Sequence, residues 1–214
     1  MRTIKPQWMV AALLTCACSA YQTPVELVRA GVLDNACQIQ DASVYSESGS
    51  IDLGYTDTYL LPVRWRSNLL ASTTTVNGEV IATANNSFSG TEIDYTYTLS
   101  TGSLPASMQQ VSVVIEAGGS SDDNYFLAYP IRPDNIDALR AAVPAGTTAT
   151  LGVSVEVKGT MGSGASATTN AFYFPIVVRN TTPLTCAAPD VLVGGSVCGN
   201  VGQDETPFCG TVTP

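Results

Sequence analysis

Apolar and polar residues alternate with a period of two over much of this chain, the pattern of strands that bury one face. Residues 58–68, TYLLPVRWRSN, show it most clearly. Their buried face is expected to hold Leu61, Val63 and Trp65. The opposite face is expected to hold Pro62, Arg64 and Arg66. Pro62 also predicts an edge position or a bulge, because proline has no amide proton to donate to a sheet.

The same periodicity predicts a series of further strands separated by turn-forming residues. In residues 91–99, for example, Ile93, Tyr95, Tyr97 and Leu99 share one face, and in residues 147–160 Leu151, Val153, Val155 and Val157 alternate in the same way. Asn77 and Gly78 form a dipeptide typical of a two-residue hairpin turn. The remaining strands are expected at residues 37–45, 79–84, 110–117, 125–131, 147–160 and 168–178.

One short helix interrupts this pattern. Pro133 precedes the segment DNIDALRAA, in which Asp134 is the expected N-cap and Ile136 and Leu139 lie at helical spacing. A proline and a glycine at positions 144 and 146 predict where the helix stops. About eight or nine strands with one helix indicate an all-β fold, a two-sheet antiparallel β-sandwich of the immunoglobulin-like or a related kind.

The N-terminal segment resembles a bacterial export signal. Arg2 and Lys5 precede a short apolar run, which is followed by small residues and cysteines. The run is too short for a transmembrane helix, which needs about 20 apolar residues. A cysteine directly after such a run is typical of a lipoprotein box, so residues 1–18 are interpreted as a lipoprotein signal peptide. Cleavage by ordinary signal peptidase after Ala20 is the alternative.

Two cysteines compete for acylation. Cys16 has Leu13 three residues before it, as a lipobox prefers, but Thr15 directly before it; Cys18 has the small neighbour Ala17. Acylation at Cys18 leaves four cysteines, which can all pair, whereas acylation at Cys16 leaves an odd number. Cysteine parity therefore favours Cys18. An anchored protein needs a tether, which we expect at residues 19–36.

The cysteines after the signal are Cys37, Cys186, Cys198 and Cys209. In an exported protein they are expected to form disulfides rather than a zinc site, because no CxxC knuckle is present. Four cysteines allow three connectivities, which sequence does not separate. Of these we favour Cys198 with Cys209 and Cys37 with Cys186. Residues 37–180 would then form the β-sandwich domain, and residues 181–214 a disulfide-stapled C-terminal cassette.

Charge and composition exclude several classes of function. The chain has 9 basic and 18 acidic residues, a net charge of −9. Loss of Arg2 and Lys5 with the signal leaves 7 basic residues and a net charge of −11, which disfavours nucleic-acid binding. No histidine is present, so Ser-His-Asp and Cys-His catalysis and imidazole-ligated zinc are excluded. We expect no cofactor and no metal site, including at the polar loop of residues 118–124, which lacks the DxDxDG spacing of calcium loops.

Two kinds of residue keep other functions open. Trp65, Tyr95, Tyr97 and Tyr125 are candidate stacking surfaces for a glycan or small ligand, although each also fits a packed sheet face. Asp122-Asp123 and Asp204-Glu205 are the adjacent acid pairs. Neighbouring residues on a strand point to opposite faces, so neither pair is expected to form the acid/base dyad of a hydrolase.

The order of these features resembles a group of predicted lipoproteins from myxobacteria and related deltaproteobacteria. The shared features are a signal ending in cysteine, segments like TYLLPVRWRSNLL and FYFPIVV, and a closing cassette like CGNVGQDETPFC. Its most specific part is GQD-x(4)-Cys, from Gly202-Gln203-Asp204 to Cys209. Members of this group often carry another cysteine pair after the late strand, where this chain has Arg179-Asn180-Thr181. The resemblance implies an envelope location and this fold, and no chemistry.

The sequence thus predicts a non-enzymatic exported lipoprotein. It would be held by its acyl chain at the outer membrane, facing the periplasm or the cell exterior, as a structural or adhesive module. A β-sandwich that binds a glycan or small ligand is the alternative, and a hydrolase built on carboxylates a more distant one.

Overall fold

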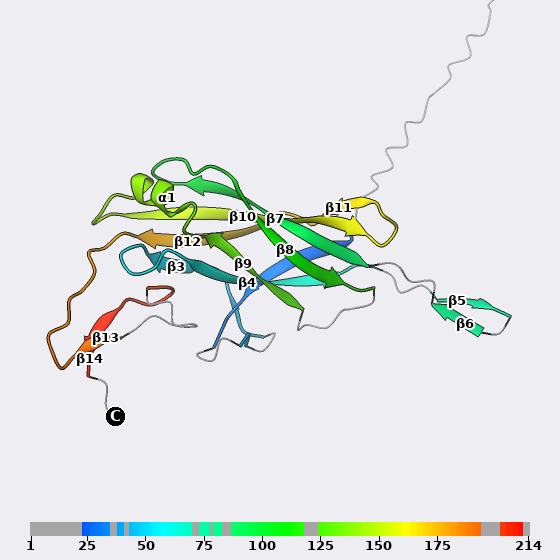
Figure 1. The fold of residues 1–214 in the computed structure, drawn as a ribbon, viewed down its shortest axis with the longest axis horizontal. Coiled ribbons are helices and arrows are strands. Elements are labelled where there is room, and N and C mark those ends of the chain that lie inside the picture. Colours follow the sequence, from blue (N-terminus) through cyan, green and yellow to red (C-terminus); the bar gives the residue numbers. More distant parts are fainter. Residues whose placement is uncertain are drawn as a thin grey trace, which may run out of the picture.

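A computed structural model describes residues 23–34, 38–40, 43–69, 73–77, 79–82, 87–117, 124–193 and 202–211. Within these ranges the chain is mostly β, with one short helix and several sheets (Figure 1). The expected signal peptide, both candidate lipidation cysteines (Cys16 and Cys18), Cys37, Cys198 and most of the acidic loop at residues 118–124 lie outside the described residues.

A four-stranded sheet has the order β2-β1-β4-β9, and all its pairings are antiparallel. Its strands are β2 (Tyr45–Ser46), β1 (Val25–Gly31), β4 (Tyr59–Ser67) and β9 (Tyr125–Ile131). The bounds of β9 are those predicted from the alternation. The strand expected at residues 37–45 is much reduced: of its described residues, Ile39 forms an isolated bridge with Leu33, and Tyr45 begins the two-residue β2.

A larger sheet has the order β3-β12-β10-β7-β8, with β11 pairing β10. Its strands are β3 (Gly49–Asp52), β12 (Phe172–Arg179), β10 (Thr148–Met161), β7 (Phe88–Leu99), β8 (Ser107–Ile115) and β11 (Ser166–Thr168). The expectation of purely antiparallel sheets is wrong at one place, because β3 pairs β12 in parallel. A parallel neighbour is possible here because a long connection, including β4 to β11, separates the two strands in the chain.

Two small hairpin-like pairs complete the described strands. β5 (Thr73–Val76) and β6 (Glu79–Ala82) are joined by the predicted two-residue turn, with Asn77 at φ 53°. β13 (Val191–Val193) pairs β14 (Phe208–Gly210) within the C-terminal cassette. The described residues thus contain fourteen strands, and the sequence predicted eight or nine. Several of the strands are only two to four residues long, which is too short to show an alternation of apolar and polar residues.

One core is shared by the two larger sheets. The predicted inward faces of β10 and β7 are confirmed: Leu151, Val153 and Val155 are fully buried, and so are Ile93 and Tyr95. From the other sheet, Val25, Leu61 and Val63 belong to the same cluster of buried side chains. In these strands a period of two therefore identified residues that face the core.

Residues 25–31 form β1, so the prediction of a tether over residues 19–36 is wrong for this part. β1 lies between β2 and β4, with Val25 at 0% and Leu27 at 4% exposure. A register shift between Leu27 and Arg29 interrupts the strand. This bulge breaks the alternation of apolar residues, which is why the pattern of residues 25–31 did not predict a strand.

Residues predicted on the outer face of β4 are partly buried. Arg64 is 2% exposed, and its Nη2 donates to the carbonyl of Gln40 at 3.0 Å. Pro62 is also buried, and it lies between β1 and β9 rather than at an edge. Pro62 also pairs in register with Leu127, and the nearby register shift places its extra residue in β9, between Ala128 and Ile131, so the bulge expected at this proline is not found in β4. Arg66 is exposed as predicted.

The helix α1 (Ile136–Ala142) is present, but its N-cap is Asn135 instead of Asp134. Asp134 pairs with Arg132. Asn135 does not cap the helix with its side chain. Its Nδ2 donates instead to the carbonyl of Pro130 at 3.0 Å, and its Oδ1 accepts from the Arg132 amide. The Asn135 side chain therefore bonds to the backbone at the end of β9 and not to the first turn of the helix.

Candidate functional site

The C-terminal cassette closes the free edge of the larger sheet. We call Gly202, Gln203 and Asp204 the GQD segment. Gln203 forms an antiparallel bridge with Ile51 of β3. The Asp204 amide donates to the Ser50 carbonyl, and the amide of β3 residue Asp52 donates to the Gly202 carbonyl, both at 2.8 Å. The segment therefore adds to β3, the terminal strand, on the side away from β12.

A disulfide fixes this segment covalently. Cys186, which follows β12, bonds to Cys209 in β14, with Cα atoms 5.5 Å apart. The favoured pairing of Cys198 with Cys209 and Cys37 with Cys186 is therefore wrong. In the β13–β14 pair, Leu192 lies opposite Cys209, so the disulfide joins Cys209 to a residue that precedes this pair. Spacing along the chain carried no information about that pairing.

The Gln203 side chain joins the two larger sheets. Its Oε1 accepts from the Leu60 amide and its Nε2 donates to the Leu60 carbonyl, each at 3.0 Å. β1 reaches only as far as Val63 on β4, so the Leu60 backbone lies beyond the end of that pairing. A buried backbone amide or carbonyl without a partner is costly. Gln203, itself 2% exposed, supplies both partners.

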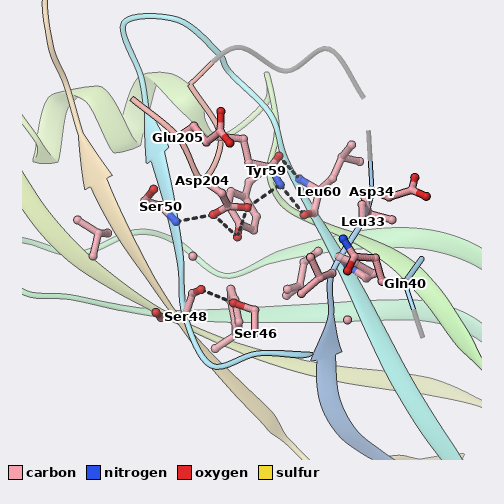
Figure 2. A pocket seen from close by; sticks show the side chains of 18 of the residues that line it. Leu33, Asp34, Gln40, Ser46, Ser48, Ser50, Tyr59, Leu60, Asp204 and Glu205 are labelled. Atoms are coloured by element: carbon pink, nitrogen blue, oxygen red, sulfur yellow. Dashed lines mark hydrogen bonds between the residues drawn. The ribbon is translucent and has the colours of Figure 1, made fainter. Parts of the chain in front are cut away.

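Asp204 and Tyr59 meet beside this bridge (Figure 2). The Tyr59 hydroxyl lies 3.1 Å from Asp204 Oδ1, and the Ser50 amide donates to the same oxygen at 2.8 Å. Asp204 is an exposed residue, but these neighbours remove its carboxyl oxygens partly from water. This desolvation raises the pKa of Asp204, against the lowering effect of its hydrogen bonds. Burial, and then the Asp204 charge, raise the pKa of Tyr59 well above its ordinary value.

Two glycines make this arrangement possible. A Cβ on Gly49 would lie 1.8 Å from the Tyr59 hydroxyl and 3.1 Å from Asp204 Oδ1. Gly202 has φ 97°, a left-handed conformation that other residues rarely adopt. Both positions are therefore restricted to glycine by the contact between Tyr59 and Asp204 and by the entry of the GQD segment.

A cavity of about 680 Å³ lies over the GQD segment, between it, the β2–β3 region and β4 (Figure 2). Its polar lining includes carboxylates, serines and one guanidinium: Asp34, Asp204, Glu205, Ser46, Ser48, Ser50 and Arg179. Its apolar lining includes Leu33, Leu61 and Phe174. Three carboxylates against one guanidinium suit a neutral polar or cationic small ligand better than an anionic one.

Asp204 and Glu205 line the same cavity, contrary to the expectation that neighbouring residues point apart. That expectation assumed strand geometry. Asp204 has φ 59°, in the left-handed region, so the alternation of a strand does not hold at this position. The Asp204 carboxylate is engaged by Ser50, Tyr59 and Gln203, which makes it a structural group in this state.

The candidate stacking residues do not gather in one place. Trp65 is 9% exposed and Tyr95 is fully buried, so both rings belong to the core. Tyr97 is half-buried, and its hydroxyl donates to the Pro130 carbonyl at 2.8 Å. Tyr125 is 42% exposed and borders a smaller cavity of about 300 Å³ with Leu33, Gln38, Ile39 and Leu127. A stacking site built from these rings together is therefore not formed.

Within the described residues, no group of three or more carboxylate or cysteine side chains is placed to hold a metal ion. No helix in the same ranges is long and apolar enough to cross a membrane. Searches against known protein families, curated proteins and solved structures found no match for this chain.

The cluster of Tyr59, Gln203 and Asp204 with the Ser50 backbone was not predicted as a site. The GQD portion was recognised as the most specific part of the cassette, which is the one sequence signal that marks it. Nothing along the chain indicates its partners, because Tyr59 and Asp204 are 145 positions apart.

Proposed function

We propose that this protein is an exported envelope module with a structural or adhesive role and no catalysis. The observation that carries the proposal is the disulfide between Cys186 and Cys209. Disulfides form and persist in oxidising compartments such as the bacterial periplasm and the cell surface. Here the bond holds the GQD segment on β3, so an oxidising compartment would be needed to complete the fold.

The proposed anchor is an acyl chain on Cys18, with Cys16 as the alternative. Because β1 begins at Val25, the proposed tether shortens to residues 19–24. Such a tether would keep the β domain close to the outer membrane, on the periplasmic or the exterior side. The proposed relationship to the myxobacterial and deltaproteobacterial lipoproteins is consistent with this location.

We infer that the two larger sheets form a β-sandwich of the immunoglobulin-like or a related kind. Two contacts support the inference. The rings of Tyr59 in β4 and Phe174 in β12 lie 6.4 Å apart. Asn170, just before β12, accepts from the Leu27 amide at 2.7 Å and donates to the Leu27 carbonyl at 3.1 Å. The first contact joins the two sheets, and the second joins β1 to the segment that leads into β12.

Expression with the native leader and intact-mass measurement without reduction would test the location and the anchor together. We expect a mature chain beginning at Cys18, with the mass of an attached diacylglycerol group, in the outer-membrane fraction. Cys18→Ser should abolish palmitate labelling, whereas Cys16→Ser, the matched control, should retain it. Labelling lost only in Cys16→Ser would show that Cys16 is the acylated residue. An unprocessed cytosolic chain would refute the proposal.

A second candidate is a small-ligand site in the cavity over the GQD segment. Its volume of about 680 Å³ lies within the range of ligand-binding pockets. Thermal-shift measurements with neutral sugars and with small organic amines would test it. Ser48→Trp should fill part of the cavity and remove any stabilisation by the ligand. Exposed Thr206, outside the cavity lining, supplies the control Thr206→Trp.

A further inference from the structure

The described part of the C-terminal cassette has no share in the hydrophobic core. Every described member of the core cluster lies between Val25 and Val178, and so do the partly buried apolar side chains packed against it. Several apolar side chains of the cassette are exposed instead: Leu184 by 50%, Val191 by 43% and Phe208 by 58%. Figure 1 shows the β13–β14 pair set apart from the two larger sheets. Apolar burial, the main favourable term in folding, therefore does little to hold the cassette in place.

Hydrogen bonds and one disulfide hold the GQD segment. The hydrogen bonds join it to β3, to Tyr59 and to the backbone of Leu60. Each adds little net free energy, because an open segment would bond to water instead and would regain its conformational entropy. The disulfide between Cys186 and Cys209 closes the loop that contains the segment, and a cross-link over a loop of this size favours the closed state about 100-fold. The position of the segment therefore depends chiefly on the disulfide.

The disulfide lies at the surface of the protein. Cys209 is exposed and Cys186 is half-buried. The rate of thiol–disulfide exchange depends on access to the sulfur atoms, and exposed disulfides are more easily reduced than buried ones. Because the core of the β domain is built from residues that precede the cassette, an external thiol can reach this bond without unfolding the domain.

We propose that the Cys186–Cys209 disulfide is a latch that an external dithiol opens and a disulfide oxidant closes. One thiolate of the dithiol attacks Cys209 Sγ, the bond between the two cysteine sulfurs breaks, and Cys186 leaves as a thiolate that takes up a proton. The second thiol of the reductant then displaces Cys209. Two electrons and two protons pass from the dithiol to the protein, so the dithiol becomes a disulfide and both cysteines become thiols.

Opening the latch changes two features of the fold together. The Asp52 amide and the Ser50 carbonyl lose their partners on the GQD segment, so the outer edge of β3 is exposed. Gln203, Asp204 and Glu205 leave the cavity lining, so the cavity loses one wall. The latch deepens the proposed function, on whose oxidising location it rests. Its test uses the purified chain, so a cassette that does not open and a cytosolic location give different results.

Alkylation and hydrogen exchange of the full processed chain test the latch. Dithiothreitol without denaturant should make Cys186 and Cys209 reactive to iodoacetamide, as measured by mass spectrometry. Exchange at the Asp52 and Asp204 amides should then accelerate about 100-fold, because the loop is no longer cross-linked. Exchange at Val153, in β10 between two paired strands, should stay slow. Oxidised glutathione should restore the original rates.

The variant Cys186→Ser/Cys209→Ser supplies the control. Its Asp52 and Asp204 amides should exchange rapidly before dithiothreitol is added, and dithiothreitol should produce no further change. That result would assign the effect to this bond and not to another cysteine. Three results would each overturn the proposal: a disulfide that dithiothreitol reduces only in urea, a GQD segment that stays protected after reduction, or a loss of protection that extends to Val153.

Discussion

Gln203 completes the backbone hydrogen bonding of Leu60 across the gap between two sheets, accepting at Oε1 and donating from Nε2 at 3.0 Å each. Asn170 makes the same two-bond contact with Leu27. Leu27 adjoins the bulge in β1, and Leu60 lies at the register shift between β4 and β9. Carboxamides have one donor and one acceptor side, so they can replace a missing strand neighbour at such irregularities.

Gln203→Ala should therefore destabilise the protein by about 2–4 kcal/mol, because it leaves the Leu60 amide and carbonyl without partners. Urea unfolding followed by tryptophan fluorescence measures this change. Exposed Thr206, three residues further along the chain, provides the control: Thr206→Ala should change stability by less than about 0.5 kcal/mol. Equal effects of the two substitutions would contradict the assigned role of Gln203.

The raised pKa of Asp204 predicts a pH dependence of stability. Its protonated form is favoured in the folded state, so its contribution is present below the unfolded pKa and is lost as pH rises through the folded pKa. The stability of the wild type relative to Asp204→Asn should thus fall as pH rises above about 4. Urea unfolding at a series of pH values tests the sign, and a relative stability that rises with pH would contradict it.

Tyr59→Phe provides a matched test of the same carboxyl. The Tyr59 hydroxyl lowers the pKa of Asp204 through its hydrogen bond, so its loss should move the transition to higher pH. In an Asp204→Asn background, Tyr59→Phe should produce no such shift. A shift of equal size in both backgrounds would show that another group is responsible.

Loss of the Cys186–Cys209 disulfide should cost about 3 kcal/mol, from the entropy of closing a loop with a sequence separation of 23. Cys186→Ser/Cys209→Ser should also release the GQD segment from β3, increasing hydrogen exchange at the Asp52 and Asp204 amides. Peptide mapping without reduction should recover Cys186 and Cys209 in one cross-linked product. A product joining Cys198 to Cys209 would contradict the structure.

The assignment of residues 25–31 to β1 rather than to a tether also has a direct test. Leu27→Ala, at a buried position, should cost about 2–5 kcal/mol. Val28, next to it in β1 and 44% exposed, gives the control. Val28→Ala should change stability by less than about 0.5 kcal/mol. If both substitutions were neutral, the segment would be a tether after all.

Sequence alone was sufficient where a regular strand packs one face on the core. Leu151, Val153 and Val155 of β10, and Ile93 and Tyr95 of β7, are buried as their spacing predicted. The same is true of the Asn77 turn, since a two-residue hairpin depends only on local backbone conformation. These features are short-range, and the amino-acid pattern determines them.

Tertiary structure decided everything that depends on residues far apart in the chain. A bulge interrupts the alternation of β1, so the sequence did not predict that strand. The folded chain brings Cys186 and Cys209, 23 positions apart, within bonding distance. The contacts of Gln203 with Leu60 and of Asp204 with Tyr59 join positions more than 140 residues apart. The sequence marked the GQD segment as specific, but only the folded chain reveals the unpaired backbone of Leu60 that gives Gln203 its role.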